Sequence, residues 1–293
     1  MPTGSLTTDP GIDYAPLFDL ERRRLLELLR SLDASRWALP SPCPGWSVLG
    51  LAAHLVGDDL SLVSWLRDDH RGTPAPDGLD EPGFITWLDE LQMEWVHAAR
   101  RLSPRLTIEL LEWLGQRVTS TVAGQDPTAV TASVSWAADH PVPVWLDHAR
   151  ELSERWIHRQ QLLQAVGHPS DLRTDLAVPV LDGLRWAYPH RLAAHPRPAG
   201  ARILVEIVDD QAPATWQLTS DGSAWSFRSG AGSQTGAAGD GAVVAALRVS
   251  LDQAWRLLTN NHDPDRDGPL QLEGDPELTT VLRRTRAIIG API

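Results

Sequence analysis

The chain has 293 residues, enough for one large domain or two ordinary ones, and its 26 basic and 38 acidic residues give a net charge of −12. This charge disfavours a general nucleic-acid-binding protein, which needs a basic surface, and the single cysteine, Cys43, excludes an internal disulfide and a zinc site built from several thiolates. The N-terminus has no basic region followed by an apolar run, and no window approaches about 18 successive apolar residues, so we expect a soluble, cytoplasmic protein.

Four helices are predicted before the middle of the chain. Leucines at helical spacing indicate a helix over 12–32. The prolines of LPSPCPGW forbid helix, and Ser47 is a plausible N-cap for a second helix that ends at residue 65 or 66. Apolar stripes predict a third helix over 84–102 and a fourth over 104–118.

A long connection over 123–143 leads to a fifth predicted helix, VWLDHARELSERWIHRQQLLQAVG, over 144–167. Glu154 and His158 stand four residues apart, so on a helix they share one face, with Cβ atoms roughly 5–6 Å apart. That separation allows both side chains to bind one metal ion. On spacing alone the polar stripe is more typical of a solvated face than of a metal site, although apolar residues flank it on both sides.

The predicted second helix carries another polar pair, His54 and Asp58. A histidine within AAHLV is usually a hydrogen-bonded core residue, and Asp58 can be an ordinary helix carboxylate. Cys43, in the preceding turn, is expected to be a small buried apolar residue, because a nucleophile would need a neighbouring base. Four or five long helices before residue 170 predict a bundle, in which sites are built from inward-facing side chains of different helices.

The composition changes after residue 167. A bridging helix is predicted over 176–192, followed by three strands over 201–209, 214–220 and 224–229. A strand, a helix capped by Ser250, a further strand and a closing helix complete an α+β pattern. The Gly-rich stretch 230–241 lacks the lysine of a phosphate-binding loop, so we do not expect it to bind phosphate.

Three segments, SPCPGWSVLGLAAHL, WVHAARRLSPRLTIELL and PVWLDHARELSERWIHRQQL, resemble the mycothiol-dependent maleylpyruvate isomerase family. The resemblance implies a fold that is mainly α plus α+β. A DinB-like four-helix bundle would occupy 1–170, and a bridging helix with a smaller sterol-carrier-like α+β domain would occupy 171–293. It also implies that His54, Glu154 and His158 are metal ligands.

Two imidazoles and a carboxylate suit Zn²⁺, with bonds of about 2.0–2.2 Å, and three protein ligands leave one position open, as in catalytic sites. Nickel, iron and copper accept the same ligand types. Asp58 is a candidate catalytic residue that would either be a fourth ligand or orient the others. Asp147 and Glu151 are candidates for orienting the ligands, and Glu151 is also a candidate catalytic residue.

In the family the thiol is mycothiol. A free thiol has a pKa near about 8.5, and coordination to a metal deprotonates it. The thiolate would add to the cis double bond of a maleylpyruvate-like substrate, and rotation followed by elimination would release the trans isomer; transfer of the thiolate to an electrophile would instead make an S-transferase. The family's C-terminal domain helps to close the active site, so Arg228, Arg248 and Arg256 are candidates for holding substrate carboxylates, and Arg256 also for binding the cofactor.

Two other functions fit the same residues. A metal-assisted hydrolase would need no thiol and would use Asp58 or Glu151 as the base on a bound water. A non-catalytic protein would bind an apolar ligand in its C-terminal domain and use the metal only to stabilise the bundle. The expected partners are a small-molecule electrophile and a low-molecular-weight thiol, without nucleic acid or membrane, and the chain would be a monomer or a homodimer.

Overall fold

The computed structural model describes residues 11–227 and 241–287, and these residues form two compact units. The helical unit comprises Asp13–Pro127 and Glu151–Asp171. The α+β unit comprises Thr128–Arg150 and the described residues from Leu172 onward. The domain limits inferred from the sequence, 1–170 and 171–293, stay a prediction.

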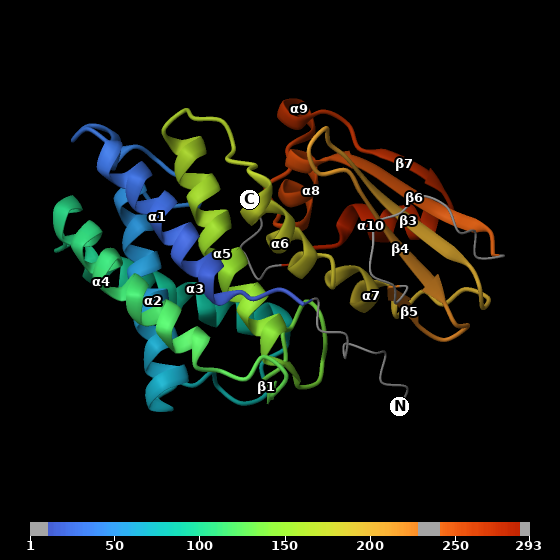
Figure 1. Ribbon diagram of the computed structural model, residues 1–293, viewed down its shortest axis with the longest axis horizontal. Helices are drawn as coiled ribbons and strands as arrows, with labels where there is room; N and C mark the ends of the chain where they lie inside the picture. The colour runs from blue at the N-terminus through green and yellow to red at the C-terminus, as the bar shows by residue number, and fades with distance from the viewer. Residues whose placement is uncertain (1–10, 228–240, 288–293) are drawn as a thin grey trace. The chain divides into compact units, whose positions relative to one another are not determined.

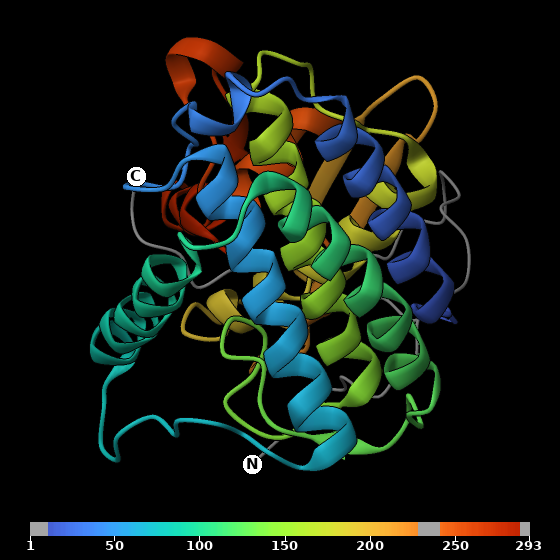
Figure 2. The ribbon, with the colours of Figure 1, turned by 90° about the vertical axis from the view of Figure 1, so that its left-hand side faces the viewer.

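Four helices of the helical unit run alongside one another and form a bundle (Figure 2). They are α1 (Ala15–Ser31), α2 (Val48–Asp68), α4 (Pro104–Ala123) and the part of α5 (Val144–Ala165) that begins at Glu151. A further helix, α3 (Glu81–Ala99), packs on α2, and one turn of 3₁₀ helix, η1 (Arg36–Ala38), precedes α2. The predicted bundle is therefore confirmed.

The helix limits follow from local capping. The Ser47 side chain accepts a hydrogen bond from the backbone of Gly50 at 3.2 Å, which confirms the predicted cap of α2. The side chain of Asp80 caps α3 in the same way, so this helix begins three residues before the predicted 84. The fourth helix continues past the predicted 118, because Val118 and Val122 keep the buried stripe in register.

The core of the bundle is built from leucines, valines, one alanine and one tryptophan. Its buried members are Leu25, Leu26, Leu29, Trp37, Val48, Leu51, Ala52, Leu55, Val56, Leu111, Leu114, Leu162 and Val166. Burying a leucine or valine stabilises a fold by about 1.5–3 kcal/mol, so this cluster supplies much of the driving force for packing the helices. It also fixes which faces of α2 and α5 are left for polar side chains.

Helix α2 is the one helix of the described ranges that is long and apolar enough to span a membrane. Of its most apolar window, 56% is buried inside the protein. Its apolar residues thus serve the bundle core, as is common for a central helix.

The α+β unit contains a five-stranded sheet with the order β5-β4-β3-β6-β7 (Figure 1). Its strands are β3 (Arg202–Val208), β4 (Ala214–Ser220), β5 (Trp225–Phe227), β6 (Val243–Ser250) and β7 (Gln271–Gly274). Strands β3 and β6 are parallel, and every other neighbouring pair is antiparallel. Alternate residues of β3, namely Ile203, Val205 and Ile207, are buried, as expected of a sheet with one covered face. A separate pair, β1 (Val130–Thr131) and β2 (Val142–Pro143), lies in the connection before α5.

The predicted bridging helix needs a correction. In place of one helix over 176–192 there are two, α6 (Thr174–Leu184) and α7 (Ala187–Leu192). Pro189 explains the break, because proline lacks an N–H and its ring clashes with the carbonyl four residues earlier, at Arg185.

The remaining helices are α8 (Leu251–Leu258), α9 (Pro264–Asp267) and α10 (Pro276–Arg284). Ser250 caps α8 as predicted and forms a reciprocal capping box with Gln253. Helix α9, a single turn, is not predicted from the sequence. Except for Gly241, the Gly-rich stretch 230–241 lies outside the described residues. The mainly α plus α+β fold class is confirmed, and the sterol-carrier-like character of the second unit stays a prediction.

Candidate metal centre

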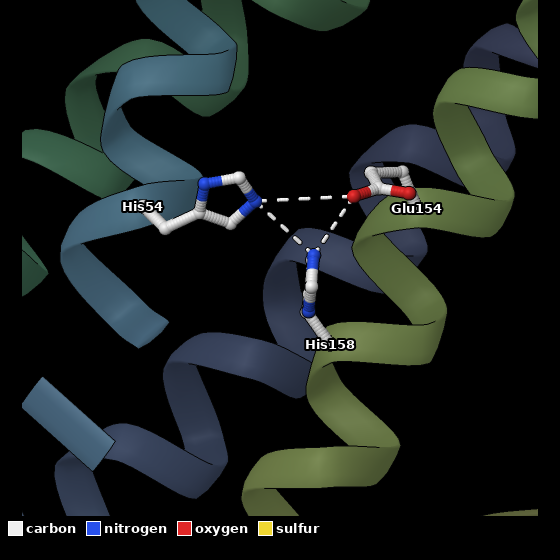
Figure 3. Close-up of side chains that lie close together, drawn as sticks. All are labelled: His54, Glu154 and His158. Carbon is white, nitrogen blue, oxygen red and sulfur yellow. Dashed lines mark hydrogen bonds and ion pairs between the residues drawn. The ribbon is translucent and has the colours of Figure 1, made fainter. Parts of the chain in front are cut away.

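Three side chains from α2 and α5 direct their donor atoms toward one point (Figure 3). His158 Nε2 lies 2.8 Å from Glu154 Oε1 and 3.1 Å from His54 Nε2. His54 Nε2 lies 3.8 Å from Glu154 Oε1. Within residues 11–227 and 241–287 this is the one group of three or more metal-ligating side chains whose donor atoms approach so closely. We call His54, Glu154 and His158 the triad.

The spacing of the triad fits one metal ion. Donors that surround a metal tetrahedrally with bonds of about 2.1 Å stand about 3.4 Å from one another. The three separations, 2.8, 3.1 and 3.8 Å, bracket that value. Two imidazole nitrogens and a carboxylate oxygen are ligands that zinc and neighbouring divalent metals accept. The triad could therefore hold a divalent metal ion.

The members of the triad differ in how exposed they are. His54 and His158 are buried, whereas 34% of the Glu154 side chain is exposed. A metal ion held by these residues would be reached from the Glu154 side. Three ligands with an accessible fourth position are typical of a catalytic metal site.

Each histidine of the triad also contacts a glutamine through its other ring nitrogen. His54 Nδ1 lies 3.1 Å from Gln92 Oε1, and His158 Nδ1 lies 2.7 Å from Gln161 Oε1. The Trp46 ring packs against the ring of His54, with centroids 4.7 Å apart. Sequence reasoning missed both glutamines. The i,i+3 spacing of His158 and Gln161 could have indicated the second one, whereas Gln92 lies on another helix.

The structure brings one of the predicted carboxylates to the triad. Asp58 Oδ2 lies 3.0 Å from His54 Nε2, the nitrogen that also faces the other two ligands. Glu151 instead forms an ion pair with Arg155 at 2.7 Å, and Asp147 pairs with Arg150 at 2.8 Å. Of the three, Asp58 is thus the one placed beside the donor atoms.

The predicted arginines belong to the α+β unit. Arg228 lies outside the described residues. Arg248 is exposed on β6, in register with Glu206 of β3. Arg256 is buried on α8, where it pairs with Asp252 at 3.0 Å and lies over the ring of Trp255. A role of any of these arginines in binding substrate or cofactor stays a prediction.

A buried network of charges lies directly behind the triad. Asp59, which is fully buried, accepts hydrogen bonds from Arg22 of α1 and from Arg155 of α5, the latter at 3.1 Å. Arg159 of α5 donates to Glu21 at 2.6 Å and to Asp171 at 2.8 Å. These pairs connect α1, α2 and α5, and sequence reasoning did not identify them.

On α5, each metal-ligating residue of the triad is followed directly by an arginine of the buried network. Arg155 directly follows Glu154, and Arg159 directly follows His158. Successive residues of an α-helix point about 100° apart, so α5 directs its ligands toward His54 of α2 and its two arginines toward Asp59 of α2 and Glu21 of α1. The ion pairs thereby fix the rotation of α5 that aims the ligands at His54.

The electrostatics of the triad favour the charged forms of its members. Burial lowers the pKa of His54, but the carboxylates of Asp58 and Glu154 outweigh it and raise the pKa to about 9. Burial likewise lowers the pKa of His158, but Glu154 raises it well above its usual value. Burial raises the pKa of Glu154, yet the two histidines hold it well below its usual range.

These shifts predict a pH dependence of metal binding. In the metal-free protein the raised pKa of His54 means that the proton is held below pH about 9, and a metal must displace it. The pKa of His158 is raised as well, so metal binding should displace at least one proton at pH 7. The apparent zinc affinity should therefore rise at least about tenfold per pH unit from pH 7 to 9, measured by competition with a chelator. A plateau above pH 7 would contradict the raised pKa.

Known proteins resemble this chain in sequence and in fold. Residues 18–163, about half of the chain, match the family model described as the mycothiol maleylpyruvate isomerase N-terminal domain, and they include the whole triad. Two solved structures are similar: the crystal structure of the mycothiol-dependent maleylpyruvate isomerase and that of a mutant with one histidine replaced by alanine. Each matches with a TM-score of 0.53 and 14% identity, over 89% of this chain and 91% of the other.

At 14% identity the structural likeness establishes the fold and leaves the reaction open. No curated protein matches the chain. The family match covers the helical unit that carries the triad, and the fold agrees over most of the chain. The chain therefore belongs to the mycothiol-dependent maleylpyruvate isomerase family, a family of enzymes.

Proposed function

We propose that the protein is a metal-dependent enzyme that uses a low-molecular-weight thiol, mycothiol, to attack an electrophilic small molecule. The observation that carries this proposal is the triad, whose three donors converge while one side stays accessible. We propose Zn²⁺ as the metal and the cytoplasm as the location. A divalent metal bound there would lower the pKa of a coordinated thiol and so supply a thiolate at neutral pH.

The chain's own residues have distinct tasks in this proposal. His54, Glu154 and His158 hold the metal. Asp58, whose Oδ2 lies 3.0 Å from His54 Nε2, would accept the proton that the thiol loses and return it when the thiol is released. His54 and His158 are buried, so water has little access to their rings.

Two reactions follow from a thiolate next to an electrophile. In isomerisation, sulfur bonds to one carbon of the cis double bond, the remaining single bond rotates, and the carbon–sulfur bond breaks again to give the trans isomer. The thiol is then regenerated. In S-transfer, the carbon–sulfur bond persists, and the thiol is consumed in equal amount with the electrophile. The family relationship supports the first reaction, and the triad is compatible with both.

Turnover with defined thiols tests the proposal. Zinc-loaded protein is incubated with maleylpyruvate alone, with mycothiol, and with glutathione as a thiol of different structure. We expect isomerisation that requires both mycothiol and metal and leaves the free thiol concentration unchanged. Stoichiometric loss of thiol, with an adduct seen by mass spectrometry, would identify an S-transferase instead.

A parallel assay with carboxylic esters and amides can overturn the proposal. Metal-dependent hydrolysis of these substrates without thiol would favour the hydrolase. Absence of turnover with a panel of electrophiles, together with unfolding on chelation, would indicate a structural metal.

A further inference from the structure

Gln92 of α3 and Gln161 of α5 bind the ring nitrogens of the triad histidines that face away from the other ligands. Gln161 Oε1 lies 2.7 Å from His158 Nδ1, and Gln92 Oε1 lies 3.1 Å from His54 Nδ1. An amide oxygen only accepts hydrogen bonds, so each Nδ1 must carry its proton. In a neutral ring the lone pair is then on Nε2, the nitrogen that each ring directs at the triad.

The orientation of Gln161 is supported by a second donor. The thiol of Cys43 donates to the same Gln161 Oε1 at 3.1 Å. Two donors, one from the loop before α2 and one from α5, thus converge on this oxygen, as expected if the amide presents its carbonyl to the site. Gln161 is buried, so water competes little for these hydrogen bonds.

The position of Gln92 depends on how α3 is attached to α2. Trp95, one turn further along α3, donates its indole N–H to the backbone oxygen of Ala53 at 2.8 Å, directly before His54 in the chain. Gly57 makes room for this indole, because a Cβ at that position would lie 2.5 Å from its nitrogen. This hydrogen bond holds α3 in a position from which Gln92 contacts His54.

A glutamine differs from the usual carboxylate partner of a ligating histidine in charge. A carboxylate that accepts a hydrogen bond from the other ring nitrogen makes the imidazole a stronger metal ligand. It also reduces the positive charge left on the metal. Asp58 and Glu154 already bring two carboxylates to this site. A neutral acceptor orients the ring without adding a third negative charge, which preserves the ability of a bound metal to acidify a thiol.

We propose that Gln92 and Gln161 are the positioning residues of the metal centre, each fixing the tautomer and the ring orientation of its own histidine. The proposal rests on the proposed function only in requiring a metal at the triad. It requires neither the thiol nor a particular reaction.

The test uses the full-length protein, Zn²⁺ alone and three variants. Gln161→Met and Gln92→Met remove the acceptor at similar volume, and Gln116→Met, at an exposed position of α4, is the matched control. In the zinc-loaded, ¹⁵N-histidine-labelled native protein we expect two Nδ1–H resonances that exchange slowly with water. Gln161→Met should remove the resonance of His158 alone, and Gln92→Met that of His54 alone.

Zinc affinity provides a second measurement. Loss of an outer partner of a ligand weakens metal binding by about 10–100-fold, so each of the two variants should bind zinc weaker by that factor while the control is unchanged. Gln161→Glu restores an acceptor and should restore the His158 resonance. It should also raise the pH at which a zinc-bound thiol, monitored by isotope-edited NMR of a simple mercaptan, loses its proton.

The outcomes separate this proposal from the proposed function. Native protein that binds no zinc would contradict both the positioning proposal and the proposed function. Native protein that binds zinc, with Gln92→Met and Gln161→Met retaining both resonances and native affinity, overturns the positioning role and leaves the proposed function standing. Thermal melting of the metal-free variants identifies any variant that has lost its fold, and the other glutamine then decides the question.

Discussion

Replacing His158 by alanine is expected to abolish both metal binding and turnover. His158 Nε2 is the donor closest to both other ligands, at 2.8 Å from Glu154 and 3.1 Å from His54. Loss of a residue that hydrogen-bonds to a metal ligand already weakens metal binding by about 10–100-fold. Loss of the ligand itself should therefore weaken zinc binding by more than about a hundredfold. Elemental analysis of protein purified without chelator should find about one zinc per native chain and none in His158→Ala.

The matched control is His168→Ala, which removes an exposed histidine just beyond the same helix. It should keep both the zinc and the turnover of the native protein. Circular dichroism of His158→Ala should show the native helix content, because the bundle core of leucines and valines does not include this residue. Retention of a full equivalent of zinc by well-folded His158→Ala would show that the metal is held elsewhere.

Replacing Asp59 by alanine is expected to cause a large loss of stability. Asp59 is fully buried and is the shared acceptor for Arg22 and Arg155. Its removal takes away the carboxylate that Arg22 and Arg155 share and leaves Arg155 with Glu151, and breaking a buried ion pair costs about 3–5 kcal/mol. For a unit of this size that corresponds to a melting temperature lower by roughly 6–20 °C, measured by calorimetry.

An exposed ion pair on the same helix provides the control. Asp68 pairs with Arg67 at 2.7 Å near the end of α2, where both side chains are about half exposed. Asp68→Ala should change the free energy of unfolding by less than about 1 kcal/mol. Asp59→Asn, which keeps one acceptor but loses the charge, should fall between the two. A loss below about 1 kcal/mol for Asp59→Ala would mean that the two arginines find other partners.

Much of the architecture follows from local sequence patterns. Helical periodicity predicts the five long helices before residue 170, and alternation predicts the strands of the α+β unit, because burying one face of an element imposes its period on the chain. The observed limits of helices differ from the predicted ones at two kinds of position. One is a helix cap, as at Asp80, and the other is Pro189, which cannot donate a backbone hydrogen bond. Those signals are local too, and they were present in the sequence.

The candidate metal centre depends on the tertiary structure more than the individual helices and strands do. The sequence by itself places Glu154 and His158 on one helix face, since four residues make about one turn, and its motifs identify His54 through the family resemblance. Only the tertiary structure brings His54 to within 3.1 Å of His158 across 104 positions of the chain. It alone places Gln92 Oε1 beside His54 Nδ1 and joins the arginines of α5 to Asp59 and Glu21. The physical reason is that spacing along a helix is set by the backbone, whereas contacts between helices are set by the side chains that pack between them.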